Sequence, residues 1–228
     1  MRLPFKPTAV VFDMDGLLFD TEALYQATAA MAAAEQGRDF PDALFLRLIG
    51  EPWPANRALL IREWGSAAEV DRLHDDWMRH FDALAGERLT LKPGVAELLD
   101  TLDTLGLPRA IATSSAHAEV VRNLAMHGLT GRFDAVVARG DYARAKPAPD
   151  PYLMAAERLG MAPGACLALE DSHVGVRAAA ASGMATVMVP DILPPTDEIC
   201  ALCVAVAADL HAVRGAILAV RGDPVDAG

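Results

Sequence analysis

The sequence lacks an uninterrupted apolar run of the about 18 residues that a membrane-spanning helix needs, although 53% of its 228 residues are hydrophobic. We also expect no secretion signal, because residues 1–7 are too few and too rich in proline and the next apolar run ends at Asp13. Cysteine is scarce, and its odd number of three argues for a reducing compartment. We therefore expect a cytoplasmic protein.

Basic residues are also few, with 20 lysines and arginines against 31 aspartates and glutamates and a net charge of −11. Nucleic acids and anionic membranes select basic surfaces, so neither is expected as a partner. A small anionic substrate remains compatible with this charge, because one metal ion and one lysine can reverse its sign locally. The length suits one large domain or two small ones, and the oligomeric state is not readable from the sequence.

The most informative stretch begins with an apolar run at residues 9–12 and continues with Asp13, Asp15 and Gly16. Side chains two apart on an extended chain project to the same side, so both aspartates would emerge together at the carboxyl end of a buried strand. Two buried like charges need a shared cation or proton. Gly16 lets the backbone turn away sharply and lets a ligand approach. Taken alone, such a stretch is more often only a strand with an acidic turn.

The pattern of apolar residues divides the chain into two parts. Residues 21–88 contain helical periodicity and nothing that resembles a strand. From residue 95 onward, helices and strands alternate, which is typical of a parallel sheet in a doubly wound, Rossmann-like α/β fold. We expect a core formed by residues 1–19 and 89–228, interrupted by an all-helical insert at residues 20–88. The strands are expected at residues 8–13, 108–113, 135–138, 166–170, 185–189 and 204–207.

Polar residues follow two further strands of the predicted sheet. Thr113, Ser114 and Ser115 lead into a helix, whose N-terminal N–H groups and partial positive charge suit a phosphoryl oxygen. Taken alone, Ser115 is better interpreted as the N-cap of that helix. Lys146 enters a proline-rich run that fixes the direction of its side chain, although a lysine in a loop is usually only a solvated charge. In the same run, Asp150 is expected to cap the next helix.

A fourth predicted strand ends at Glu170 and Asp171. Like the opening stretch, it is an apolar run followed by carboxylates. Mg²⁺ prefers oxygen ligands and keeps several waters, so one or two carboxylates suffice to hold it. The competing interpretation is that Asp171 or Ser172 caps the helix that starts near Val174. Each of these signals is weak alone, but four of them in this order, each at a strand end, indicate a site.

Residues 13–22 resemble the first motif of the haloacid dehalogenase (HAD) superfamily, in the branch with a helical cap inserted just after this motif. The stretches around Thr113, Lys146 and Asp171 are similar to the second, third and fourth motifs. The resemblance covers essentially the whole chain and identifies the insert as the cap. It implies a Mg²⁺-dependent phosphatase that acts on a small phosphate monoester, such as a sugar phosphate or another metabolite.

The resemblance also implies a role for each motif residue. Asp13 would be the nucleophile that forms an aspartyl-phosphate, and Asp15 would be the general acid and then the general base. Thr113, Ser114 and Lys146 would bind the substrate's phosphoryl oxygens, together with backbone N–H groups near Asp15.

The metal would be held by the carboxylates of Asp13 and Asp171 and by the backbone carbonyl of Asp15. Glu170 would act behind them or through water.

Other members of the superfamily differ from this sequence at positions that decide the chemistry. Haloacid dehalogenases lack the second aspartate, which is present here as Asp15. Phosphonoacetaldehyde hydrolases use a lysine of the cap, and residues 21–88 contain no lysine. A non-catalytic phospho-receiver module, the remote alternative, lacks the helical insert and carries its phospho-accepting aspartate at a separate, central strand end. This sequence has Thr113 at the end of its second core strand.

β-Phosphoglucomutases are the closer alternative. They carry a histidine where this sequence has Tyr25 and an arginine where it has Trp53, although Arg57 could substitute for that arginine. These two departures favour hydrolysis over phosphate return. Tyr25, Trp53 and Arg57 are the cap residues expected to bind the substrate, with Glu51 and His80 as further candidates.

Two remaining features are interpreted as structural. Cys200 and Cys203 have the spacing of a redox or zinc pair, but no second pair accompanies them and their apolar neighbours suggest buried thiols. His173 is expected to be a surface or packing residue, although it follows Asp171 by two positions and so lies close to the expected metal.

Overall fold

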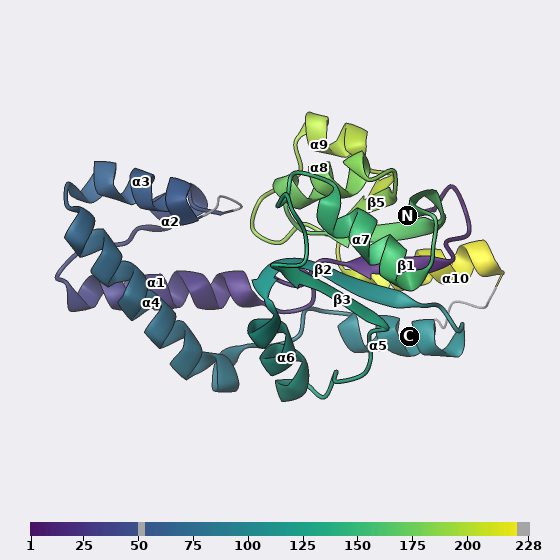
Figure 1. Ribbon diagram of the computed structural model, residues 1–228, viewed down its shortest axis with the longest axis horizontal. Helices are drawn as coiled ribbons and strands as arrows, with labels where there is room; N and C mark the ends of the chain where they lie inside the picture. The colour runs from purple at the N-terminus through teal and green to yellow at the C-terminus, as the bar shows by residue number, and fades with distance from the viewer. Residues whose placement is uncertain (50–52, 223–228) are drawn as a thin grey trace. The chain divides into compact units, whose positions relative to one another are not determined.

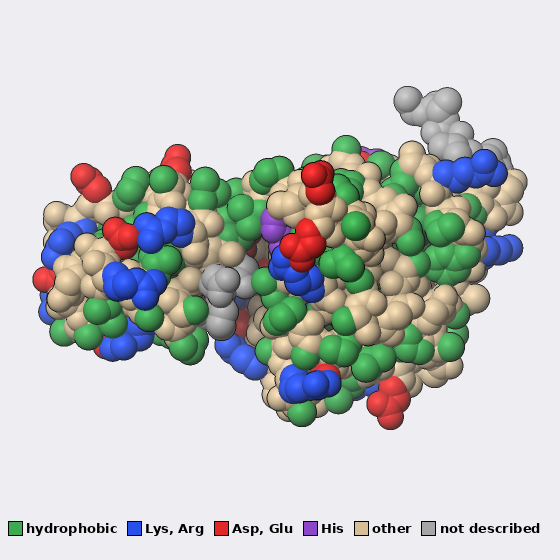
Figure 2. Space-filling model, turned by 90° about the horizontal axis from the view of Figure 1, so that it is seen from above, with side chains coloured by type: hydrophobic (Ala, Val, Ile, Leu, Met, Phe, Trp, Pro, Cys, Tyr) green, Lys and Arg blue, Asp and Glu red, His purple; other side chains and the backbone are tan. Residues whose placement is uncertain are grey.

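The computed structural model describes residues 1–49 and 53–222, and Figure 1 shows its helices and strands. The chain folds as two compact units, one of Met1–Phe19 with the chain from Leu91 onward and one of Asp20–Thr90. Within the described residues, no helix is both long and apolar enough to cross a membrane. On the face shown in Figure 2, basic side chains stand apart from one another, several of them beside acidic ones.

The first unit, the core, is built on one sheet of six parallel strands in the order β3-β2-β1-β4-β5-β6. This confirms the predicted doubly wound α/β fold. The strands are β1 (Ala9–Phe12), β2 (Arg109–Ala116), β3 (Ala135–Arg139), β4 (Cys166–Glu170), β5 (Ala185–Met188) and β6 (Ala205–Val206).

The two central strands are buried along their whole length, and their sequences are correspondingly apolar. Such runs are typical of parallel strands covered by helices on both faces. Figure 1 shows α7 (Asp150–Leu159) and α8 (His173–Ala181) on one side of the sheet and α5 (Val95–Thr104) and α6 (His117–Met126) on the other. Small residues of β1, β2 and β4 pack with α7 and α8 in one buried cluster.

The strand order determines where a ligand can bind. The chain moves outward from β1 through β2 and β3, then returns to the other side of β1 with β4 and moves outward again. The carboxyl ends of β1 and β4 therefore meet at the switch point of the sheet, which is the usual ligand-binding position in open α/β folds. Asp13 and Asp171 directly follow these two strands.

The structure corrects several local predictions. Strand β2 extends beyond Thr113 to Ala116, so Ala116 rather than Ser115 is the N-cap of α6. Pro149 precedes α7 as its N-cap, and Asp150 instead accepts hydrogen bonds from Arg144.

A short helix that was not predicted, α9 (Asp197–Leu202), carries Cys200, which is exposed, and is followed by Cys203, which is half-buried. The prediction of two buried thiols was therefore wrong. The core ends with α10 (Leu210–Arg221).

The part of the second unit that the structure describes contains four helices and no strand. They are α1 (Thr21–Glu35), α2 (Asp42–Leu46), α3 (Trp53–Trp64) and α4 (Ala67–Arg88). Ser66 caps α4 by accepting a hydrogen bond from the Glu69 N–H. The buried stripe of α4 includes Val70, Leu73 and Trp77, at the three-to-four spacing that places side chains on one helical face.

Candidate active site

The first strand delivers two carboxylates to the switch point. Asp13 is buried, and its N–H donates to the carbonyl of Leu169, so the ends of β1 and β4 are tied together. Gly16 has a φ of +81°, a left-handed conformation in which a side chain would be strained. Its N–H closes the turn by donating to the Phe19 carbonyl at 2.9 Å. Asp15, inside this turn, is half-buried.

Lys146 joins the first and fourth strand ends. Its ammonium group lies 2.5 Å from Oδ1 of Asp13 and 2.6 Å from Oε1 of Glu170. The lysine side chain is 6% exposed, so these contacts are shielded from solvent. Burial lowers the pKa of Lys146, but the two carboxylates outweigh burial and raise the pKa above its usual value. Lys146 therefore remains charged between Asp13 and Glu170.

Glu170 is held on both of its oxygens. Its Oε1 also accepts a hydrogen bond from the phenol of Tyr152 at 2.6 Å. Its Oε2 accepts from the N–H groups of Asp171 and Ser172 and from the Ser172 hydroxyl, at 3.1 to 3.2 Å. Burial raises the pKa of Glu170, but Lys146 and these donors outweigh burial and lower it. Glu170 is thus an ionised, fixed anchor for the lysine.

The helix that follows is shaped around this carboxylate. A Cβ atom at Gly175 would lie between 1.7 and 2.1 Å from the carboxyl carbon and oxygens of Glu170, so only glycine fits. The Gly175 N–H also donates to the Ser172 hydroxyl at 3.1 Å, which makes Ser172 the N-cap of α8. The alternative interpretation of the sequence was that Asp171 or Ser172 caps this helix. The structure assigns the cap to Ser172 and not to Asp171.

The carboxyl group of Asp15 is oriented by the end of β2. The Ser115 hydroxyl donates to its Oδ2 at 2.6 Å, and the Thr113 hydroxyl lies 3.4 Å from the same oxygen. Burial raises the pKa of Asp15, and the Ser115 hydrogen bond opposes this effect only in part. A raised pKa suits a group that must donate a proton. Ser114, between the two contacting residues, is exposed.

Three carboxylates at the strand ends are suited to a metal ion. Asp13, Glu170 and Asp171 are all buried, and each offers one oxygen within 4.8 Å of the others. Burial is the main cause that raises the pKa of Asp13 to about 8; Lys146 opposes this shift, and the negative charges of Glu170 and Asp15 add to it. One lysine therefore does not balance the buried negative charge. Oxygen donors in this number and this excess of charge fit a cation such as Mg²⁺.

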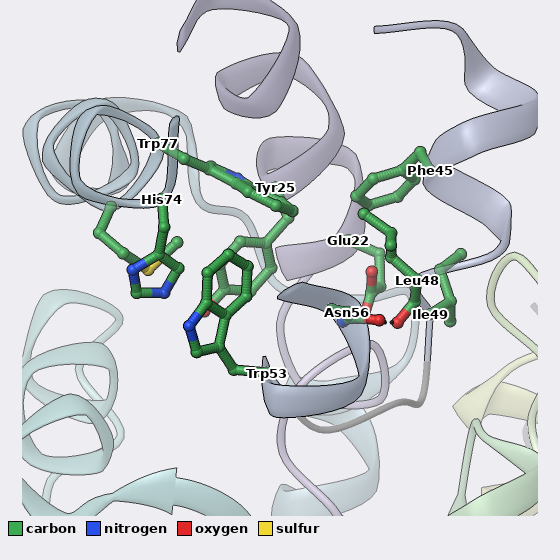
Figure 3. Close-up of a pocket in the computed structure, with 10 residues that line it drawn as sticks. Glu22, Tyr25, Phe45, Leu48, Ile49, Trp53, Asn56, His74 and Trp77 are labelled. Atoms are coloured by element: carbon green, nitrogen blue, oxygen red, sulfur yellow. Dashed lines mark hydrogen bonds between the residues drawn. The ribbon is translucent and has the colours of Figure 1, made fainter. Parts of the chain in front are cut away.

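The second unit contains a pocket of about 270 Å³, shown in Figure 3. Tyr25 and Trp53 are among the residues that line it. The Trp53 ring stacks on the ring of His74, with centroids 3.9 Å apart, and burial lowers the pKa of His74. The full lining consists of Glu22, Tyr25, Phe45, Leu48, Ile49, Trp53, Asn56, His74, Trp77 and Met78.

The other predicted cap residues have different surroundings. Arg57 is not part of that lining, and it donates two hydrogen bonds to the carboxylate of Asp71, at 2.6 and 2.8 Å. His80 contacts Glu35 at 3.0 Å. Glu51 lies outside the described residues.

His173 is the remaining candidate, and it belongs to the first unit. Its Nε2 lies 2.9 Å from the carbonyl oxygen of Pro194, and no hydrogen bond joins it to Asp13, Glu170 or Asp171 among the described residues.

Comparison with known proteins identifies the family. A family model described as a haloacid dehalogenase-like hydrolase matches residues 7–183. The chain belongs to this family. Protein CbbY from a plasmid of Cupriavidus necator is 37% identical to this hydrolase over 207 residues, which cover 83% of this chain and 81% of the relative.

A phosphorylated carbohydrates phosphatase from Thermotoga maritima is 32% identical over 180 residues, which cover 77% of this chain and 82% of the relative. A HAD family hydrolase from Deinococcus radiodurans, solved with bound phosphate and sodium, has a TM-score of 0.77 and 27% identity. That match covers 96% of this chain and 97% of the solved one.

The predicted superfamily is therefore confirmed, and this hydrolase is an enzyme of the phosphoric monoester hydrolase class. The non-catalytic receiver module is excluded by the same findings. The structure brings Asp13, Asp15, Lys146 and Asp171 to one edge of the sheet, with Thr113 beside them. The catalytic and ligand roles of these residues stay predictions.

Two residues of the site were missed from the sequence. Ser115 was interpreted as a helix cap but contacts Asp15, and Tyr152 was not considered although it holds Glu170. A buried tyrosine needs a partner for its hydroxyl, so its position on the apolar face of α7 was the available signal.

Proposed function

We propose that the protein is a Mg²⁺-dependent phosphatase that hydrolyses a small phosphate monoester through an aspartyl-phosphate on Asp13. The observation that carries this proposal is the contact of Lys146 with both Asp13 and Glu170 inside a buried site. Phosphoryl transfer depends mainly on positioning and charge neutralisation, and this lysine is fixed beside the proposed nucleophile. A cytoplasmic location stays a prediction.

The first step would form a bond between a carboxylate oxygen of Asp13 and phosphorus while the ester P–O bond breaks. The departing alkoxide would take the proton of the Asp15 carboxylic acid and leave as an alcohol. The raised pKa of Asp15 and its hydrogen bond from Ser115 support this role. Thr113, Ser114 and Lys146 would bind the phosphoryl oxygens.

In the second step, Asp15 would accept a proton from water as the water oxygen attacks phosphorus. The bond between phosphorus and the Asp13 oxygen would break, which restores the carboxylate and releases inorganic phosphate. The proton balance is complete, because Asp15 returns to the acid form in which it started.

The metal would be held by the side chains of Asp13 and Asp171 and the backbone carbonyl of Asp15, with Glu170 behind them. When bound, Mg²⁺ supplies positive charge that offsets the charge of the phosphoryl group. The excess of buried carboxylate at this edge of the sheet supports the assignment.

The substrate is proposed to be a sugar phosphate or a similar metabolite, as the name of the Thermotoga relative suggests. Tyr25 and Trp53 are proposed to contact its non-phosphate part, since both line the pocket in the second unit. Hydrolysis is favoured over the mutase alternative, because Arg57 is engaged by Asp71 and the mutase arginine position is occupied by Trp53.

The test is phosphate release from a panel of sugar and metabolite phosphates, with and without Mg²⁺. Asp13→Asn serves as the blank, since it keeps the shape of the side chain and loses the nucleophile. Release that needs Mg²⁺ and is lost in Asp13→Asn is the expected result. Isomerisation of β-glucose 1-phosphate without phosphate release would instead establish the mutase.

A further inference from the structure

A fourth carboxylate lies next to the candidate metal site, on a loop that the proposed mechanism does not use. Asp191 follows β5, the strand that pairs with β4 on its outer side. The two strand ends stay together beyond the last pair, because the Val189 N–H donates to the Glu170 carbonyl at 2.7 Å. This loop therefore leaves the sheet at the edge where Asp171 lies.

One oxygen of this carboxylate is paired with a lysine. Nζ of Lys92 lies 2.6 Å from Oδ1 of Asp191, and the two side chains are 22% and 10% exposed. Lys92 comes from the segment that precedes α5, far from Asp191 in sequence. The contact fixes the orientation of the carboxylate and offsets its charge in a poorly solvated place.

The other oxygen is buried, and no described residue donates a hydrogen bond to it. A buried acceptor without a donor costs free energy, on the order of 1–3 kcal/mol. The contact with Lys92 through Oδ1 leaves Oδ2 on the buried side of the carboxylate. Its Oδ2 is therefore held where a donor is needed.

The direction of this oxygen follows from its position relative to Gly16. A Cβ atom on Gly16 would lie 2.3 Å from Oδ2 of Asp171 and 3.2 Å from Oδ2 of Asp191. The two oxygens thus border the same point in the turn after β1. One belongs to a proposed metal ligand, and the other is an acceptor that lacks a protein donor.

A hydrated cation supplies the missing donor. Mg²⁺ gives up its water reluctantly and keeps several water molecules when one or two carboxylates bind it. Groups that accept hydrogen bonds behind the direct ligands tune metal affinity, and their loss commonly costs about 10- to 100-fold. Asp191 has the burial, the charge and the position for this task.

We propose that Asp191 is a positioning residue for the divalent cation: held by Lys92, its Oδ2 accepts a hydrogen bond from the hydration shell of the ion at Asp171. This inference rests on the proposed Mg²⁺ dependence. In this proposal Asp191 increases the affinity for Mg²⁺. The proposed roles of the nucleophile, the general acid and the phosphoryl-binding groups do not change.

The experiment is a calorimetric titration of chelator-treated protein with Mg²⁺ in the absence of substrate. Asp191→Asn is expected to weaken Mg²⁺ binding at least tenfold. The matched control is Asp197→Asn, which removes the same charge from an exposed position in α9 and is expected to stay within twofold of wild type. If Asp191→Asn also stays within twofold, the proposal is overturned.

A purely structural role of the Lys92–Asp191 pair would show a different pattern. Asp191→Asn would then lower the urea midpoint in chelator without changing Mg²⁺ affinity, and this outcome also overturns the proposal. If Asp191→Asn does not fold, Lys92→Gln decides, because it keeps the carboxylate and removes its orientation. At least threefold weaker Mg²⁺ binding by Lys92→Gln supports the proposal, and unchanged binding refutes it.

The titration also separates this inference from the proposed function. Wild-type protein that binds no Mg²⁺ would refute the metal dependence itself, and the inference with it. Mg²⁺ binding by wild type with no effect of Asp191→Asn would refute the inference alone.

Discussion

The phenol of Tyr152 donates a hydrogen bond to Oε1 of Glu170 across 2.6 Å, and both side chains are fully buried. The same oxygen accepts from the ammonium group of Lys146 at 2.6 Å. Lys146 Nζ also lies 5.0 Å from the centroid of the tyrosine ring. The position of the lysine beside Asp13 thus depends on a tyrosine that need not touch the substrate.

Tyr152→Phe is expected to reduce kcat/KM about tenfold, equivalent to roughly 1.4 kcal/mol, because Lys146 is less firmly held. The free energy of unfolding should fall by about 1.5–3 kcal/mol, since the lost hydrogen bond is to a charged group. Steady-state kinetics and urea unfolding measure the two effects.

Tyr142→Phe is the matched control, because the Tyr142 hydroxyl donates to the Thr113 carbonyl and not to Glu170. Equal loss of activity in the two variants would contradict a specific role for Tyr152.

Ser115 and Ser114 are adjacent residues with different expected effects. Ser115→Ala removes the hydroxyl that orients the Asp15 carboxyl group, so kcat should fall about tenfold, equivalent to roughly 1.4 kcal/mol for one hydrogen bond. Ser114→Ala should instead raise KM and leave kcat nearly unchanged, if Ser114 binds phosphoryl oxygens as the sequence predicts. Kinetics of both variants on one substrate separate the two roles. A raised KM with normal kcat for Ser115→Ala would refute the role of Ser115 in orienting Asp15.

Gly175→Ala is expected to disrupt the site, because the added Cβ would overlap the Glu170 carboxylate. Either Glu170 or α8 must move, and we expect a loss of about 1–3 kcal/mol of stability together with most of the activity. Urea unfolding and phosphate release provide the measurements.

Gly215→Ala is the control for Gly175→Ala. Gly215 also lies in a helix, α10, and an added Cβ meets no atom of its surroundings within 4 Å. This substitution should be neutral or stabilise the protein by up to about 1 kcal/mol. Similar destabilisation by both substitutions would argue against the contact with Glu170.

Asp141 should give the core a pH-dependent stability. Arg158, the Ala138 N–H and His117 all contact its carboxylate, and together they hold its pKa well below the usual range. A carboxyl with a lower pKa in the folded state adds stability above its unfolded pKa of about 3.9, and this stability is lost as the pH falls further.

Asp141→Asn should therefore cost about 1.5–3 kcal/mol at pH 7 and progressively less below pH ~4. Urea unfolding across this range tests the trend, with the exposed Asp39→Asn as a variant that should show little cost at any pH. A difference between wild type and Asp141→Asn that grows on acidification would show the sign to be wrong.

The architecture could be predicted from the sequence because apolar runs and helical periodicity are local signals. Strand β1 and the part of β4 that precedes Glu170 are uninterrupted apolar runs, and the sequence of α4 shows the spacing of its buried residues directly. Helix α9 was missed because it has six residues, too few to display a period. The end of β2 was placed too early because serines 114 and 115 have no strong preference for strands.

The candidate site was predictable only where the residues formed a motif. Asp13 and Lys146 were singled out although they are far apart in the chain, because each stands in a stretch that resembles the family. Tyr152 and Asp191 stand in no such stretch. Their importance comes from contacts with Glu170 and Lys92 that only the folded chain creates.

The position of the insert has a consequence for the order of events during synthesis. Strand β1 is the centre of the sheet, yet its first partner, β2, leaves the ribosome about 100 residues later. At typical rates of elongation this is a delay of roughly 5–20 s. The insert is contiguous and can fold in that interval, whereas Ala9–Phe12 must wait as an unpaired apolar segment. We therefore expect the nascent chain, and not the finished enzyme, to be the species that needs a chaperone.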